Sequence, residues 1–387
     1  MFSFFVEVKK GDVMKTQALS VARFMANLAS FGLAASLVAC GGSDYGSGGM
    51  ATPMPAPPLM PPTTATAYVL KSLVADTSGA AAHTDANLKN AWGIVFNPAG
   101  FVWVVNNGTS TSTLYDGNGV PQSLVVAVPG GPTGIVFNSS QDFKVSQNGH
   151  TGASAFIFVG ESGTVSGWSP SVNLNNAVGV VDASAGGKVY KGLAIANYLG
   201  FNYLYAADFH NASIDVYDSS FTKVSLPGGF KDASIPAGYA PFGIQAIGAK
   251  IYVAYAKQDA QAHDEIAGTS LGIIDVFDTA GVFIKQLAFG GALNAPWGMT
   301  MAPANFGSLS DMLLVANFGD GRINAYDPDT GRFAGVLSGA DGSPIVIDGL
   351  WGIAFGNGIN SQPANTLFFT AGPSDEAHGL YGRIDVP

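Results

Sequence analysis

The sequence of 387 residues contains one cysteine, Cys40, so an intrachain disulfide and a metal site built from several thiolates are both excluded. Charged residues are scarce as well, at 11% of the chain compared with about 25% in an average soluble domain. An apolar run at residues 24–38 is shorter than the roughly 18 residues that a membrane-spanning helix needs. Glycine is abundant instead, with 51 residues, and this combination favours many short strands joined by tight turns over a helical bundle.

The protein is acidic, because it contains 27 aspartates and glutamates but only 17 lysines and arginines, which gives a formal net charge of −10. A surface of this sign repels nucleic-acid phosphates and anionic lipid headgroups. We therefore predict that nucleic acid is not a partner of this protein. The acidic balance also has a simpler interpretation, since net charge by itself keeps a protein soluble.

Residues 1–39 have the composition of an export signal. Lys15 and Arg23 precede the apolar run, and small residues lead to Cys40, as in a secretory signal peptide. The cysteine and the residues before it also resemble the lipobox of bacterial lipoproteins. That resemblance implies that Cys40 is lipidated and anchors the exported protein to a membrane, and Gly41 after it implies the outer membrane, with the periplasm or cell surface as its surroundings. An ordinary signal peptide with a chance cysteine is the alternative.

The sequence on either side of this signal sets the domain boundaries. Glu7 and Asp12 fit poorly ahead of an export signal, so we predict that translation starts at Met14. Residues 40–67 are rich in glycine, serine and proline and cannot bury a core, which is typical of a tether. Residues 68–387 then form the folded body.

A short phrase recurs six times in the folded body, and in each copy a glycine precedes an aliphatic residue. Its glycines are Gly93, Gly134, Gly192, Gly243, Gly298 and Gly352. Their spacing of 41 to 58 residues, with strand-like segments inside each unit, is the mark of a β-propeller. We predict an all-β fold, a six-bladed β-propeller with four-stranded blades.

The strand order within a repeat follows from its patterning. An unbroken apolar segment follows each glycine phrase and is typical of a strand buried on both faces. An alternating segment that ends in an aspartate turn comes next, as at residues 214–218. The last repeat stops after its third strand, whereas residues 68–73 read as an outer strand with no repeat before them. We therefore predict that the N-terminal strand completes the sixth blade and closes the ring.

Polar residues gather on one face of the predicted ring. In a propeller, the loops between second and third strands share a face with the loops that join one blade to the next, so they surround one mouth of the channel. We predict that residues 259–265, within the long loop at residues 257–268, form a mobile rim or lid there. Seven side chains from these loops are our candidates for binding a ligand or a metal ion: Glu161, Asp208, His210, Asn317, Asp320, Asn106 and Asp85.

Two interpretations of these side chains stay open. Carboxylate, amide and imidazole groups are ligands for Ca²⁺ or another divalent metal ion, and a bound metal would activate water in a hydrolase. The same residue types are ordinary turn formers, so a structural role is the alternative for each of them. The aromatic residues of the repeated phrase, among them Trp92 and Phe242, are predicted to fill space between blades rather than to stack on a ligand.

Eight motifs of the folded body resemble, in the same order, those of an uncharacterised family of exported bacterial β-propeller proteins. The chain is more loosely similar to NHL-repeat and gluconolactonase-like propellers. That looser likeness implies metal ligands around the channel, with Glu161, Asn317 and Asp208 as counterparts, although their local motifs differ from that family's. The eight motifs stand at residues 90–94, 160–168, 190–194, 207–211, 238–242, 293–298, 316–321 and 349–352.

These observations predict a propeller tethered to the cell envelope that binds a small ligand or a protein partner at its polar mouth. No catalysis is assigned, because the sequence contains neither a nucleophile elbow nor a zinc-protease motif. A metal-dependent hydrolase of lactones or esters is one alternative. A purely structural envelope protein is the other.

Overall fold

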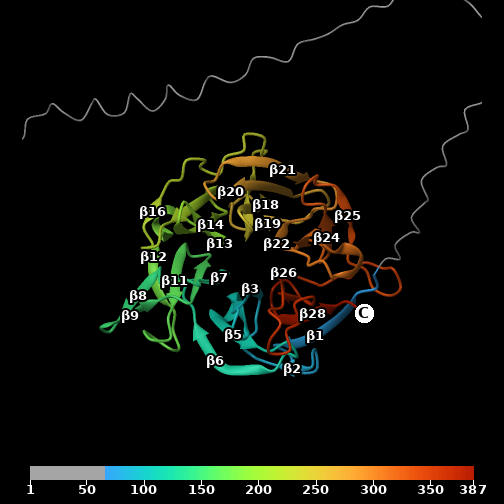
Figure 1. Ribbon diagram of the computed structural model, residues 1–387, viewed down its shortest axis with the longest axis horizontal. Coiled ribbons are helices and arrows are strands. Elements are labelled where there is room, and N and C mark those ends of the chain that lie inside the picture. Colours follow the sequence, from blue (N-terminus) through green and yellow to red (C-terminus); the bar gives the residue numbers. More distant parts are fainter. Residues whose placement is uncertain (1–65) are drawn as a thin grey trace, which may run out of the picture. The chain divides into compact units, whose positions relative to one another are not determined.

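The computed structural model describes residues 66–387, which fold as six sheets arranged in a ring (Figure 1). The predicted signal peptide, the start at Met14, the lipidated Cys40 and the tether up to residue 65 lie outside the described residues. Within residues 66–387, no helix has the length and apolar character needed to cross a membrane.

Each sheet is one blade, and its first strand lines the central channel. The blades are numbered in the order of these first strands. Blade 1 consists of β3 (Ala91–Phe96), β4 (Val102–Asn106), β5 (Thr111–Tyr115) and β6 (Pro121–Ala127). Blade 2 consists of β7 (Pro132–Phe137), β10 (Phe156–Gly160), β11 (Thr164–Trp168) and β12 (Val178–Asp182). Blade 3 consists of β13 (Tyr190–Tyr198), β14 (Phe201–Asp208), β15 (Ser213–Tyr217) and β16 (Lys223–Val224).

The second half of the ring repeats this plan. Blade 4 consists of β17 (Tyr239–Ile247), β18 (Lys250–Gln258), β20 (Ile273–Asp278) and β21 (Phe283–Phe289). Blade 5 consists of β22 (Pro296–Met301), β23 (Leu313–Asn317), β24 (Ile323–Tyr326) and β25 (Phe333–Val336). Blade 6 consists of β26 (Leu350–Phe355), β27 (Leu367–Ala371), β28 (Leu380–Asp385) and the N-terminal β1 (Val69–Ala75).

A few short elements are added to this plan. Strand β2 (His83–Thr84) pairs with β1, and β19 (Glu265–Ile266) pairs with the end of β18. A separate hairpin of β8 (Lys144–Gln147) and β9 (His150–Ala153) is inserted between the first two strands of blade 2, which accounts for the longest glycine spacing. Three single 3₁₀ turns complete the described elements: η1 (Asn107–Thr109), η2 (Ser184–Gly186) and η3 (Gly307–Leu309).

The predicted ring closure is confirmed. Strand β1 pairs antiparallel with β28, with Val69 opposite Asp385 and Ala75 opposite Leu380. An ion pair of 2.8 Å between Lys71 and Asp385 lies on the same ladder. The sixth blade is therefore built from both ends of the described chain, and β1 covers the outer edge of β28.

The repeated glycines are explained by close contact between neighbouring first strands. A Cβ atom on Gly93 would lie 2.7 Å from the carbonyl oxygen of Thr133, and one on Gly352 would lie 2.6 Å from that of Trp92. The other four glycines meet the backbone of the next blade in the same way. Only glycine allows this approach, so the six phrases mark the six contacts that close the ring.

Second strands form the core, as their apolar patterning predicted. All residues of β4, β10, β23 and β27 are buried, and their side chains pack against the strands of the adjacent blades. This packing leaves polar groups mainly at the ends of the strands, where the loops around the channel begin.

Candidate functional site

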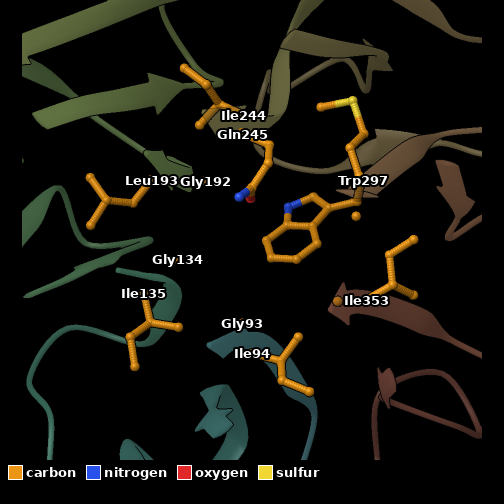
Figure 2. Close-up of a pocket in the computed structure, with 13 residues that line it drawn as sticks. Gly93, Ile94, Gly134, Ile135, Gly192, Leu193, Ile244, Gln245, Trp297 and Ile353 are labelled. Carbon is orange, nitrogen blue, oxygen red and sulfur yellow. The ribbon is translucent and has the colours of Figure 1, made fainter. Parts of the chain in front are cut away.

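The residue before each repeated glycine lies at one end of the channel. In four blades this residue is aromatic, and Trp92, Phe242, Trp297 and Trp351 pack into one buried cluster. Figure 2 shows the indole of Trp297 inside the ring of first strands. Side chains from blades 1, 4, 5 and 6 can meet only at the channel, so they form what we call the aromatic plug.

The aromatic plug is stacked across the channel axis. The rings of Trp92 and Trp351 lie parallel with centroids 3.6 Å apart, and Trp297 meets both edge-on at 5.9 and 5.7 Å. Phe318 covers the other face of Trp351, at 4.1 Å. The recurring aromatic residues are thus buried and structural, as predicted, but these rings fill one end of the channel rather than the space between blades.

Blade 3 departs from this pattern, because Lys191 stands where most blades carry an aromatic ring. Its side chain is 1% exposed, and its ammonium group lies 5.0 Å from the centre of the Trp92 ring. The ammonium group donates to Glu161 at 2.6 Å and to Asp264 at 3.1 Å. Burial acts to lower the pKa of the Lys191 amine, but the carboxylates around it outweigh burial and raise that pKa. Lys191 is therefore a buried cation.

Four carboxyl groups from three blades surround this ammonium group. Glu161 follows β10, Asp264 and Glu265 lie in the hairpin made by β18 and β19, and Glu376 follows β27. Lys191 acts on all four: it pairs with the first two, and it opposes the raised pKa of the other two. We call these five residues the mouth cluster.

Two asparagines hold the mouth cluster in place. Asn107 donates to Glu161 at 2.8 Å, and Asn90 donates to Glu376 at 2.9 Å. The oxygen of the Asn90 amide also accepts a bond of 3.1 Å from the indole of Trp351, which links the mouth cluster to the aromatic plug. The cluster is therefore built on the ends of the buried strands.

The carboxyl groups of the mouth cluster differ in the direction in which their pKa values are shifted. Burial raises the pKa of Glu265 to about 7, with Lys191 acting in the opposite direction. Burial also raises the pKa of Glu376. Burial would raise the pKa of Asp264 too, but its contacts with Lys191 and His263 hold it below the ordinary value. Near neutral pH the cluster thus contains carboxylates beside a carboxyl group that exchanges its proton readily.

The seven side chains predicted from the sequence do not gather at one point. Glu161 is the member that lies in the mouth cluster. His210 is exposed, with a ring nitrogen 3.2 Å from the carbonyl oxygen of Ala262. Asp85 accepts from the hydroxyl of Tyr115 at 2.9 Å and from the backbone of its own turn.

Three more of the predicted residues occupy one repeated place, the last residue of the second strand. Asn106 donates to the hydroxyl of Thr113 on β5 at 3.0 Å. Asp208 is fully buried and accepts from Lys188 at 2.7 Å; this lysine also reaches Asp215 on β15 at 3.2 Å.

In blade 5 the same place is held by Asn317, which donates to the carbonyl oxygen of Ala292 at 2.8 Å, as does Asn324 on β24 at 3.0 Å. Asn317 also donates to Asp320 at 3.1 Å. In blades 1, 3 and 5, therefore, these polar residues connect the second strand to the third.

Metal ligands come together in one place among the described residues. The ligand atoms of Glu161, His263 and Asp264 all lie within 4.8 Å of one another, whereas no other group of three His, Cys, Asp or Glu side chains in residues 66–387 does so. The ammonium group of Lys191 bonds the carboxylates of two of these three residues. A divalent ion would have to displace it, so the donor set fits a metal poorly.

Sequence reasoning missed Lys191, Asp264, Glu265 and Glu376 as site residues. A signal for the first was present, because a lysine replaces the aromatic residue of the repeated phrase in one blade. The three carboxyl groups lie in loops predicted at the mouth face, two of them in the predicted rim or lid, but nothing in the sequence distinguished them from the other polar residues there. The loop predicted as a rim or lid is folded as a hairpin, with Lys257 opposite Ile266.

The fold and its site define a class of protein, the six-bladed β-propellers with a polar mouth over a channel that aromatic side chains close at one end. No family model matches the chain. The chain belongs to the family of two uncharacterized proteins of Acanthamoeba polyphaga mimivirus, R648 and L690. It is 35% identical to R648 over 340 residues, which cover 84% of this chain and 82% of R648. It is 34% identical to L690 over 343 residues, which cover 84% of this chain and 88% of L690.

Solved structures share the fold at low sequence identity. A protein of unknown function from Bacteroides thetaiotaomicron has a TM-score of 0.55 and is 10% identical, with 83% of this chain and 76% of that chain covered. A glucose dehydrogenase has a TM-score of 0.51 and is 12% identical, with 82% and 100% covered. These likenesses agree with the propeller prediction. The resemblance to an exported bacterial family stays a prediction, since R648 and L690 are viral proteins.

Proposed function

We propose that this protein is a binding propeller without catalytic turnover, whose mouth cluster binds a small ligand or a group on a protein partner. The observation that supports this proposal is Lys191, a lysine that is 1% exposed at a place where four blades carry an aromatic residue. An aromatic ring at this place would extend the aromatic plug. The lysine instead brings a charge into the channel.

Burying an ammonium group and its carboxylate partners costs several kcal/mol of hydration for each ion, and their mutual attraction only offsets part of this. A structural role alone is met more simply by the aromatic residue that the repeat already uses. Places that break the local pattern of a fold without a gain in packing are where a functional role is expected. We therefore assign ligand contact to Lys191 and to the carboxyl groups around it.

The chemistry of the mouth cluster favours a particular kind of ligand. Ionised carboxylates only accept hydrogen bonds, and the four carboxyl groups face one ammonium group and the amides of Asn107 and Asn90 as donors. Hydrogen-bond acceptors are thus in excess, and Asp264 is 63% exposed at the opening. The ligand that matches this site is small, polar and rich in hydroxyl or amine donors.

Binding is tested by titrating the full chain with a panel of polyols and diamines, such as sorbitol, myo-inositol and putrescine, and following ligand signals by saturation-transfer NMR. We expect at least one compound to bind, and we expect Lys191→Met to abolish its binding. Lys144→Met, at an exposed position of strand β8, is the matched control and should bind normally. Equal binding by both variants would contradict the assignment of the site.

A metal-dependent hydrolase is the second candidate; the grouping of Glu161, His263 and Asp264 is the observation behind it, although a metal ion there would have to displace Lys191. The hydrolase candidate predicts that protein purified without chelator contains a stoichiometric divalent ion and that the Glu161→Ala variant does not. It also predicts that the protein hydrolyses simple lactones or esters and that a chelator stops this hydrolysis. Elemental mass spectrometry and a lactone assay distinguish the two candidates. A purely structural protein predicts that alanine at these positions changes stability alone.

We also propose that the propeller is exported and held at the membrane by a lipid on Cys40, on the strength of the sequence before the described residues. In a bacterial host fed with labelled palmitate, the wild-type chain should carry the label in the membrane fraction and Cys40→Ser should not. Label in neither protein would contradict lipidation at Cys40.

A further inference from the structure

A pocket of about 460 Å³ lies between blades 3 and 4, apart from the mouth cluster. Its walls come from the start of β15, from the loop that joins the two blades, and from β17 and β18. Three aromatic rings line it, those of Phe230, Tyr239 and Tyr255, and Asp232 adds a carboxyl group. Its size lies within the range of pockets that hold small organic ligands, about 300 to 1,000 Å³.

Beside Tyr255 of this pocket lies a buried carboxyl group with no cation next to it. Asp275 on β20 is 0% exposed, and neither of its oxygens makes a hydrogen bond of ordinary geometry among the described residues; its polar neighbours are Asp232, Gln286 and Tyr255. An unpaired buried carboxylate is among the most unfavourable groups that a folded protein can contain. Its presence therefore needs an explanation outside packing.

The other blades show how the fold normally satisfies this place. Asp275 lies opposite Val253, just as Asp215 lies opposite Ala206 in blade 3 and Asn324 lies opposite Val315 in blade 5. Asp215 is paired with Lys188, Lys223 and Tyr190, and Asn324 donates to a backbone carbonyl.

Blade 4 lacks this arrangement because Tyr255 takes the place that Asp208 and Asn317 hold in blades 3 and 5. Tyr255 lines the pocket, and its pKa is raised first by burial and then by the charge of Asp275 and of Asp232. Burial and the neighbouring Asp232 raise the pKa of Asp275 to about 7. Asp232 thus lines the pocket while Asp275 is buried next to Asp232 and Tyr255, and among the described residues neither carboxyl group has a paired cation of its own.

We propose that the pocket between blades 3 and 4 binds a small organic ammonium ion, which Asp232 and Asp275 attract and the rings of Phe230, Tyr239 and Tyr255 enclose. A cation supplies the opposite charge that the two carboxyl groups lack. Aromatic faces attract an ammonium group through their quadrupole and also pack against an apolar body. Lys231 lines the same pocket, but its side chain is exposed, so it can turn to solvent when a cation enters.

The test uses benzylammonium chloride and its neutral analogue benzyl alcohol, titrated into the full chain at pH 8. Binding is followed by methyl NMR, with Ile235 as the reporter in the pocket and Ile94 in the channel as the reference. We expect benzylammonium to shift the Ile235 signal and to bind at least about tenfold more tightly than benzyl alcohol.

Variants locate the charge that is responsible. Asp275→Asn and Asp232→Asn should each weaken benzylammonium binding about tenfold or more, while leaving binding of benzyl alcohol unchanged. Asn324 already occupies the equivalent place in blade 5, so Asp275→Asn introduces a residue that the fold accepts there. Asp232 lies in a loop and provides the second test. Asp329→Asn, an exposed carboxyl group in blade 5, is the control.

Equal affinity for the amine and the alcohol would overturn the proposal, and so would wild-type affinity in both pocket variants. Absence of any shift of Ile235 at millimolar benzylammonium would overturn it as well. A shift of Ile94 without one of Ile235 would place the amine in the channel and refute the assignment to this pocket.

Discussion

Asp275→Asn should stabilise the folded protein, and the gain should grow with pH. In the folded chain the pKa of Asp275 is raised from 3.8 to about 7, mainly by burial. The folded state therefore binds a proton that the unfolded state has lost, and stability falls as pH rises from about 4 through 7. At about 1.4 kcal/mol for each pKa unit, this loss amounts to about 4 kcal/mol at pH 8.5 and about 2 kcal/mol at pH 5.5.

Asparagine cannot ionise, so the variant avoids this loss. The free energy of unfolding is measured by urea titration at both pH values, followed by tryptophan fluorescence. We expect the variant to exceed the wild type by about 4 kcal/mol at pH 8.5 and by about half as much at pH 5.5. Titration of groups that do not interact with Asp275 cancels in this difference, and its coupled neighbour Asp232 is the group that does not.

Asp215→Asn is the matched control one blade earlier. Burial opposes ionisation of Asp215, but Lys223, Tyr190 and Lys188 outweigh it and lower its pKa. Removing this charge should therefore destabilise the protein, by about 2 kcal/mol at neutral pH. A pH-independent effect of Asp275→Asn, or the same sign for both variants, would refute the reasoning from burial and pairing.

The remaining predictions concern closure of the ring. Gly352→Ala places a Cβ atom 2.6 Å from the carbonyl oxygen of Trp92, so we expect this variant to lower the free energy of unfolding by about 3 kcal/mol. Gly179 has open space around it, so Gly179→Ala should change the free energy of unfolding by less than about 1 kcal/mol. Removing β1 (Val69–Ala75) exposes the edge of β28, and we expect concentration-dependent oligomers in size-exclusion chromatography; a stable monomer would show that closure by β1 is not needed.

The fold could be predicted from the sequence because every blade needs a glycine at the same place in its first strand. Neighbouring first strands approach so closely that a Cβ atom on Gly93 or Gly352 would meet the backbone of the next blade, so glycine must recur with the period of the ring. Closure was predictable for a similar reason, since a missing last strand and a surplus first strand imply each other. The hairpin of β8 and β9 was not predicted, because an insertion only lengthens one spacing.

The candidate site was predictable only in part. Sequence placed Glu161 correctly at the mouth face, but it gave equal standing to Asp208 and Asn317, which in the folded chain bond to groups that connect second and third strands. Whether a polar side chain at a strand end has such a partner depends on residues far away in the sequence.

Only the tertiary structure decided which charges are paired. Lys191 meets Asp264 across 73 positions of the chain, whereas Asp275 meets no cation at all among the described residues. Patterning along the chain determines which strands form, because burial of apolar faces follows local periodicity. Pairing of charges depends on which side chains from different blades lie next to each other, and these side chains meet only once the ring has closed.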